Sequence, residues 1–391
     1  MGSKIDEVSV DQLISQLKAV AENPDVLKGA SDSQLQDLQR YARQAGEEVE
    51  KPFETLRRII YSPLRFVVPH IAQSVGIFET LNNATEPVSI PQLSERTRIR
   101  RFTLETIMDY LCSQRMARQV GREQYTSTKL SHRLMEPSFV DGFIHFHADL
   151  YAGWGSLIHT IRDPLPDRTA FQIGNNTELD FYAWLARDEV TEVREAFHRF
   201  MESNMTVLPL WFDVVDFPSE FGAGLTDTDV AFVDVGGSIG QQCEEFKNLY
   251  PNLPGRVILQ DREDVICGAP DIEGVEKMEP GARVYYFRSV FHNCTDETCV
   301  RILQNHIPAL GPDSVIVIDD KTLPDDKLVQ DAPGMEIVAG LSLSMKMFFN
   351  ALERRRGHWE ELVAGTGLKI KEVRNYTDFS ESAIIIGKEA L

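Results

Sequence analysis

The chain has 391 residues, enough for two or three domains with a full hydrophobic core. Its composition, 42% hydrophobic and 26% charged, excludes the disordered, collagen-like and disulfide-scaffold classes. Lys and Arg number 40 against 60 Asp and Glu, and the resulting net charge of −20 argues against a nucleic-acid partner.

The cysteines and the N-terminus bear on the cellular compartment. Five scattered cysteines do not form a disulfide framework and favour a reducing environment. His292, Cys294 and Cys299 lie close in sequence but lack the paired spacing of a zinc site, so we expect no metal. The first twenty residues hold no basic segment followed by an apolar core, and no run approaches the ~18 apolar residues of a membrane span. We expect a cytoplasmic protein without a membrane partner.

The first half of the chain is predicted to be helical. Residues 8–21 and 33–46 place apolar side chains at spacings of three and four. Within residues 89–126 we expect a helix opened by Ser89 and Pro91, a longer helix, and two short strands around Gly121. This is the outline of a winged helix, and we assign residues 1–140 to such a domain.

A winged helix raises the possibility of DNA binding. Residues 91–124 hold seven arginines against four acids, an excess of three positive charges. Since the chain as a whole is strongly acidic, we interpret this segment as a surface facing solvent or a second subunit.

The second half, residues 141–391, is predicted to hold an α/β sheet domain. From about residue 225, apolar strand-like runs alternate with helical segments. The predicted strands are residues 229–235, 256–261, 283–291, 314–320 and 382–387. Strands of this kind indicate a mostly parallel sheet covered on both faces, with its ligands at the carboxyl ends of the strands.

The first predicted strand runs into a glycine-rich turn, Val-Asp-Val-Gly-Gly-Ser-Ile-Gly at residues 233–240. Gly236, Gly237 and Gly240 permit a tight turn and a close ligand approach at a helix N-terminus. Asp261 follows 21 residues after Gly240, where an acid accepts hydrogen bonds from ribose hydroxyls. The alternatives are NAD, S-adenosylmethionine (SAM), or a turn that only packs the helix. The spacing of the glycines and Asp234, placed to meet an ammonium group, favour SAM.

Beyond this turn, the chain resembles the plant and fungal class I small-molecule O-methyltransferases, which include the caffeate O-methyltransferases. The resemblance covers residues 60–391 and rests on an ordered series of motifs. These are VDVGGSIG, LQDREDVI, YYFRSVFHNCTDETCVRIL, VIVIDDKTLPDD and NALERRRGHWEELVAGTGLKI. It implies a Rossmann-like SAM-methyltransferase domain, SAM as cofactor, a small-molecule substrate, and a homodimer formed through the N-terminal winged-helix domain.

The resemblance also implies roles for individual residues. The family's catalytic base falls on His292, oriented by Asp320 and Glu353. A neutral imidazole there would take a phenol or enol proton. The cofactor positions fall on the following residues: Asp234, Gly236, Gly237, Gly240, Asp261 and Arg288. The acceptor pocket would be lined by Met345, Met347, Phe348, Phe349 and Asn350.

The chain departs from the family in two places. Members of the family usually have the sequence His-Asp-Trp at the catalytic histidine, where this chain has His292, Asn293 and Cys294. The connection from Asp261 to Gly281 is also shortened, leaving Met278 as the residue that would cover adenine.

These departures keep a second function open. Fungal pericyclases of the leporin type share the fold and bind SAM without transferring its methyl group. In such a site His132 would contact the substrate, with Lys321 and Lys346 as further donors. We therefore expect SAM-dependent O-methylation of a phenolic or enolic polyketide or alkaloid, with a SAM-dependent pericyclase as the alternative. A non-catalytic regulator that kept the winged helix is a third possibility.

Overall fold

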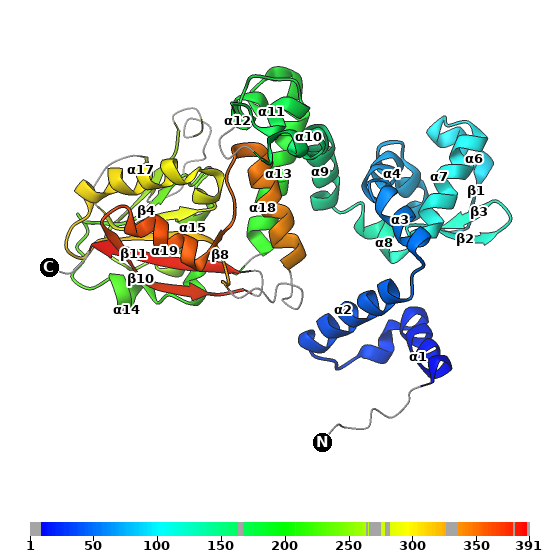
Figure 1. Cartoon of the computed structure of the whole chain (residues 1–391), viewed down its shortest axis with the longest axis horizontal. Coiled ribbons are helices and arrows are strands. Elements are labelled where there is room, and N and C mark those ends of the chain that lie inside the picture. The colour runs from blue at the N-terminus through cyan, green and yellow to red at the C-terminus, as the bar shows by residue number, and fades with distance from the viewer. Residues whose placement is uncertain are drawn as a thin grey trace. The chain divides into compact units, whose positions relative to one another are not determined.

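The computed structural model describes residues 9–162, 167–207, 209–262, 265, 275–277, 282–325, 335–377 and 380–388 (Figure 1). The chain divides into two compact units, residues 1–65 and 66–391.

The first unit is helical. It contains α1 (Val10–Glu22), α2 (Asp32–Glu48) and α3 (Pro52–Ile60). Ser9 and Ser31 close capping boxes at the first two N-termini, which explains where these helices begin. The helices predicted at residues 8–21 and 33–46 are confirmed. None of the described side chains of α1 or α3 is buried, so their apolar faces lie exposed.

The second unit opens with a small helical and antiparallel β region. Its elements are α4 (Leu64–Ser74, which begins at the unit boundary), α5 (Ile77–Asn83), β1 (Val88–Ser89), α6 (Ile90–Thr97), α7 (Arg101–Ser113), β2 (Arg118–Gly121), β3 (Gln124–Thr126) and α8 (Lys129–Arg133). The strands pair in the order β1-β3-β2. Ser89 caps α6, as predicted. The two helices and two strands predicted here are confirmed; the designation as a winged helix that dimerises stays a prediction.

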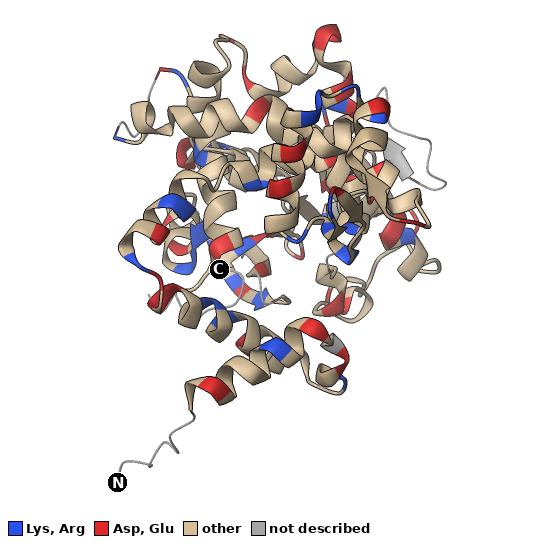
Figure 2. Ribbon diagram, turned by 90° about the vertical axis from the view of Figure 1, so that its right-hand side faces the viewer, with Lys and Arg blue, Asp and Glu red and all other residues tan. Residues whose placement is uncertain are grey.

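Two arginines of this region form ion pairs with neighbouring acids. Arg101 lies 2.7 Å from Glu105 and 2.6 Å from Glu123, and Arg96 lies 3.5 Å from Glu79. Figure 2 shows acidic and basic residues interspersed along the ribbon. These ion pairs weaken the arginine-rich segment as a phosphate-binding surface.

Further helices connect this region to the large sheet. They are α9 (Pro137–His145), α10 (Tyr151–Thr160), α11 (Ala170–Gly174), α12 (Phe181–Leu185), α13 (Thr191–Val207) and α14 (Phe217–Phe221). A π-helical turn joins α9 to α10. Arg199 of α13 binds both carboxylate oxygens of Asp141 in α9, with a shortest distance of 2.7 Å. This bidentate pair fixes the two helices against each other.

The large sheet has eight strands among the described residues. Their order is β10-β11-β8-β7-β4-β5-β6, and β9 pairs beside β8. The strands are β4 (Val230–Val235), β5 (Arg256–Gln260), β6 (Val275–Lys277), β7 (Ala282–Arg288), β8 (Val315–Leu323), β9 (Arg354–Arg355), β10 (Leu368–Asn375) and β11 (Glu381–Lys388). Strands β4 to β9 pair in parallel, and β11 pairs antiparallel with its neighbours β8 and β10. The predicted mixed α/β class with a Rossmann-like sheet is confirmed.

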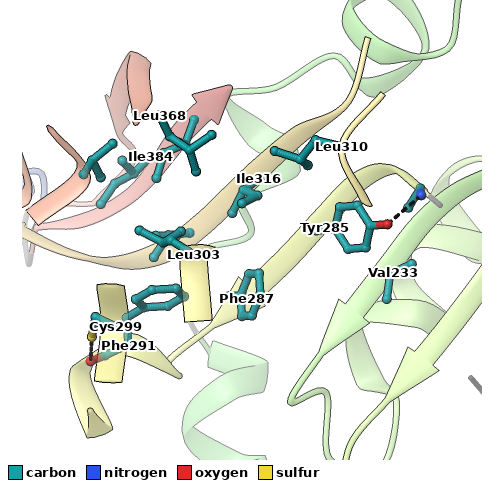
Figure 3. Close-up of a cluster of buried hydrophobic side chains, with 14 of the residues drawn as sticks. Val233, Tyr285, Phe287, Phe291, Cys299, Leu303, Leu310, Ile316, Leu368 and Ile384 are labelled. Carbon is teal, nitrogen blue, oxygen red and sulfur yellow. Dashed lines mark hydrogen bonds between the residues drawn. The ribbon is translucent and has the colours of Figure 1, made fainter. Parts of the chain in front are cut away.

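Helices cover both faces of this sheet. They are α14, α15 (Gln241–Leu249), α17 (Asp296–His306) and α19 (Arg356–Ala364). On one face, α17 and α19 pack against alternate strand residues such as Ile316 and Ile384 (Figure 3). On the other, α14 and α15 pack against Phe232 and Tyr286. Because side chains alternate between the two covered faces, each central strand is apolar over most of its length. Helix α18 (Met335–Phe349) packs against α10 and α11.

Candidate active site

The glycine turn follows β4 directly and opens α15. Gly236 and Gly240 adopt φ angles of +77° and +89°, in the left-handed region that favours glycine. A Cβ on Gly237 would lie 2.3 Å from Oδ2 of Asp234, so this position also requires glycine. The turn therefore brings main chain and a helix N-terminus without a side-chain cap to the carboxyl end of the sheet.

Two acids lie at this turn. Asp234 is buried near the end of β4, and burial, aided by the negative charge of Asp261, raises its pKa to about 7. Asp261 follows β5, and its carboxylate accepts hydrogen bonds from the backbone N–H groups of Ser238 (2.8 Å) and Arg262 (2.7 Å). The acid predicted to contact ribose thus lies against the glycine turn, as the topology requires.

Arg288, a buried cation, is the last residue of β7. The side chain of Arg288 is 8% exposed, and its Nε lies 3.8 Å from Oδ2 of Asp319. Asp319 also accepts hydrogen bonds from the hydroxyls of Tyr286 and Tyr376. Within the described part of the chain, Nη1 of Arg288 is buried without a hydrogen-bond partner. An unpaired guanidinium N–H here is suited to a ligand carboxylate.

His292 lies in the 3₁₀ turn Phe291–Asn293 that follows β7. Its Nδ1 lies 2.7 Å from Oε1 of Glu353, and its backbone N–H donates to Oδ2 of Asp320 at 3.2 Å. Asp320 belongs to β8, and Glu353 immediately precedes β9. Since β8 and β9 pair in parallel at Thr322 and Arg354, the fold brings both acids to the same turn. The three predicted catalytic residues therefore meet, although of the two acids Glu353 binds the imidazole and Asp320 binds the backbone.

The electrostatics of this cluster are set by burial and mutual charge. Burial lowers the pKa of His292, but the charge and hydrogen bond of Glu353 outweigh it, and the net pKa is raised above its ordinary value. Burial raises the pKa of Asp320 to about 7, and the charge of His292 opposes the rise. No described residue is a hydrogen-bond partner of Nε2 of His292.

The predicted acceptor residues lie at the end of α18. Met345, Met347 and Phe348 belong to a buried apolar cluster that includes Phe171 and Phe181. Phe349 stacks on the ring of Tyr182, with centroids 5.6 Å apart and an interplanar angle of 20°.

Two amides flank this apolar wall. Asn293 donates from Nδ2 to the Ser289 carbonyl at 3.0 Å and lies 3.5 Å from the Tyr182 hydroxyl. Asn350 adopts a φ of +56°, and its Oδ1 is buried with no partner among the described residues. The apolar end of α18 and the turn of His292 are thus linked through Tyr182 and Asn293.

Other predicted positions lie elsewhere or outside the described residues. His132 is exposed on α8, and no contact with the His292 cluster is present in the described structure. Lys321 pairs with Glu381. Lys346 is half-buried on α18. Met278 lies outside the described residues, so its predicted place beside adenine stays a prediction.

Sequence reasoning missed two residues of the site. Tyr182 comes from α12, a helix far from the motifs, and nothing local in the sequence indicates its role. Arg354 is buried directly after Glu353 and contacts the turn of His292. A charged residue next to a predicted catalytic acid was the available signal for it.

The described residues hold no cluster of three or more His, Cys, Asp or Glu suited to a metal ion. Among them, no helix has the length and apolar character needed to cross a bilayer.

Comparison with known proteins gives consistent matches. Residues 154–369 match the model of the O-methyltransferase domain. O-methyltransferase ucdC of Aspergillus ustus is 30% identical over 360 residues, which cover 88% of this chain and 92% of that protein. Two solved structures, one of LepI in complex with SAM and one described as a pericyclic reaction enzyme, each match with a TM-score of 0.81. Both are 25% identical over 97% of this chain and 100% of theirs.

Proposed function

The chain belongs to the O-methyltransferase family, and from this membership we propose that it methylates a hydroxyl oxygen of a phenolic or enolic secondary metabolite of the polyketide or alkaloid type, using SAM. The family resemblance drawn from the sequence is thereby confirmed. The identity of the acceptor and the role of the histidine are the proposed parts.

The residues at the carboxyl end of the sheet fit SAM. The main chain at Gly237 lies directly against Asp234, where a Cβ would have no room, and Arg288 offers an unpaired buried N–H. Asp234 and Arg288 match the ammonium and carboxylate of the amino-acid part, and Asp261 matches the ribose. When bound, the cofactor supplies an electrophilic methyl group on a sulfonium.

The contact of His292 with Glu353 carries the proposal. A carboxylate only accepts hydrogen bonds, so Glu353 holds the proton on Nδ1 and leaves the lone pair of the neutral imidazole on Nε2. An imidazole in this tautomer takes the proton of an acceptor hydroxyl as the oxygen becomes nucleophilic. Glu353 stabilises the imidazolium that results, as the raised pKa of His292 indicates.

The surroundings favour a flat, largely apolar acceptor. Phe349 and Tyr182 supply stacked aromatic faces, and Met345 and Phe348 supply apolar volume. The amide of Asn293 adds a neutral polar group beside His292 where family members carry a carboxylate.

A pericyclase that retains SAM is the second candidate. The match to a pericyclic reaction enzyme at a TM-score of 0.81, together with Asn293 in place of an acid, favours it. In that reaction Asn293 and the predicted contact His132 would donate hydrogen bonds to a carbonyl, and His292 would donate one from Nε2 in its protonated form.

We further propose that residues 1–140 form a winged-helix domain that mediates homodimerisation, and that the enzyme works in the cytoplasm. Exposed apolar residues on α1 and α3, such as Ile14 and Ile59, support a covering partner. The described cysteines are unpaired, which agrees with a reducing compartment. Sedimentation of the full chain as a monomer would reject the dimer.

The test of the proposed function is methyl transfer to a panel of phenolic and enolic polyketides and pyridones with SAM. We expect a product heavier by one methylene and a loss of about 10²- to 10⁴-fold in kcat for His292→Ala, since general-base catalysis contributes that much. His132→Ala is the informative partner variant, because only the pericyclase candidate requires His132.

A further inference from the structure

Arg354 is a buried cation that the proposed mechanism does not use. Its side chain is 1% exposed, in β9 between Glu353 and the start of α19. Because a buried guanidinium is costly to desolvate, it persists only where its N–H groups are well paired. The identity of its partners therefore indicates what it does.

Two of these partners are carbonyls on either side of His292. Nη1 donates to the Phe291 carbonyl at 2.8 Å, and Nη2 donates to the Cys294 carbonyl at 2.7 Å. Between them lie only His292 and Asn293. The planar guanidinium thus spans the turn that carries the proposed base, fixing both of its ends to β9.

The guanidinium is itself held in place. Nε and Nη2 lie 3.0 and 2.8 Å from Oδ1 of Asp296, and the other oxygen of Asp296 lies 2.7 Å from Nε2 of His358. The ring of Trp359 lies 5.2 Å from Cζ of Arg354. These contacts fix the orientation of the N–H groups that bind the turn.

We propose that Arg354 is a positioning residue that holds the turn of His292 so that the imidazole meets Glu353. This inference rests on the proposed function. Glu353 and Arg354 are consecutive in the chain. The carboxylate of Glu353 binds the side chain of His292, and the guanidinium of Arg354 binds the backbone on either side of it. Lysine keeps the charge but, with a single ammonium, cannot reproduce the two-carbonyl span.

The test compares Arg354→Lys with Arg356→Lys in the full chain. Arg356 is an exposed arginine two residues away that pairs with Glu360, so it controls for the substitution itself. The first readout is the pKa of His292 from an NMR titration with labelled histidine, assigned by His292→Ala. The titratable groups that face His292 are Glu353, Asp320, Lys321 and Cys294.

We expect Arg354→Lys to lower the pKa of His292, because the contact with Glu353 that raises it is loosened. We also expect kcat to fall by about ten- to a hundredfold while the KM for SAM stays unchanged, since misplacement of a catalytic group costs this much. Arg356→Lys should leave all three values at the wild-type level.

A folded Arg354→Lys protein with the wild-type pKa of His292 and wild-type kcat would overturn the proposal. If this variant does not fold, Asp296→Ala replaces it, because Asp296 is half exposed and holds the guanidinium of Arg354. A lowered pKa of His292 in Asp296→Ala supports the proposal, and an unchanged pKa rejects it. Absence of methyl transfer by the wild-type chain would reject the proposed function alone, because the titration needs no substrate.

Discussion

Nδ1 of His292 and Oε1 of Glu353 lie 2.7 Å apart, although 61 positions separate the two residues in the chain. The contact determines which nitrogen of the imidazole carries the proton and which is free to act as a base. The other carboxylate oxygen of Glu353 is buried without a partner among the described residues. The charge of Glu353 is therefore directed at the imidazole.

Glu353→Gln should change the pH dependence of the reaction. The base is active when neutral, so the rate should rise with pH through a His292 pKa that lies above the ordinary value of 6.5. Removing the carboxylate lowers that pKa and moves the rising limb to lower pH, while the plateau falls by about tenfold or more. The measurement is kcat/KM against pH. An unshifted limb would show that Glu353 does not act on the base.

Gly237→Ala should lower the affinity for SAM. The added Cβ would lie 2.3 Å from Oδ2 of Asp234, so the turn must move. We expect the dissociation constant for SAM to rise by about tenfold or more, as measured by isothermal titration calorimetry. Gly340→Ala in α18 is the control, because its Cβ would meet no atom within 4 Å. Equal affinity in both variants would contradict the proposed cofactor site.

SAM binding should release a proton near neutral pH. In the free protein burial raises the pKa of Asp234 to about 7, so part of the population is protonated. An ammonium placed against Asp234 favours the ionised carboxylate, so affinity should increase as pH rises through 7 and level off above it. Calorimetry in buffers of different ionisation enthalpy measures the released proton. Asp234→Asn should bind more weakly and lose this dependence; if it keeps the dependence, another group is responsible.

Phe349→Ala should weaken acceptor binding without affecting SAM. The substitution removes a ring that stacks on Tyr182, and we expect the KM for the acceptor to rise by about tenfold. Phe102→Ala, which removes an exposed ring of α7, is the control. A rise in the KM for SAM alone would show that α18 does not line the acceptor pocket.

Particular elements show how far the sequence could predict this structure. The five strands of continuous apolar residues were found because burial on both faces leaves little ambiguity. Strand β10 was missed: it alternates charges such as Lys369 and Glu372, as exposed edge strands do, and has a bulge after Ile370.

The site shows the same contrast. Two motif residues lie near their predicted partners, Asp261 at the glycine turn and Glu353 at the imidazole of His292, and their roles stay predictions. Asp320 was expected to orient the imidazole, and its hydrogen bond goes instead to the backbone of His292. The contacts of Tyr182 and Arg354 depend on tertiary packing between distant elements, and no local pattern predicts them.

The central claim is that SAM is consumed as a methyl donor. The measurement that tests it most directly is the amount of S-adenosylhomocysteine formed per product in a single reaction of the purified full chain. We predict one S-adenosylhomocysteine for each product molecule, and a product that is heavier than the substrate by one methylene. A product formed by dehydration or isomerisation, dependent on SAM but leaving it unconsumed, would contradict methyl transfer and establish the pericyclase instead.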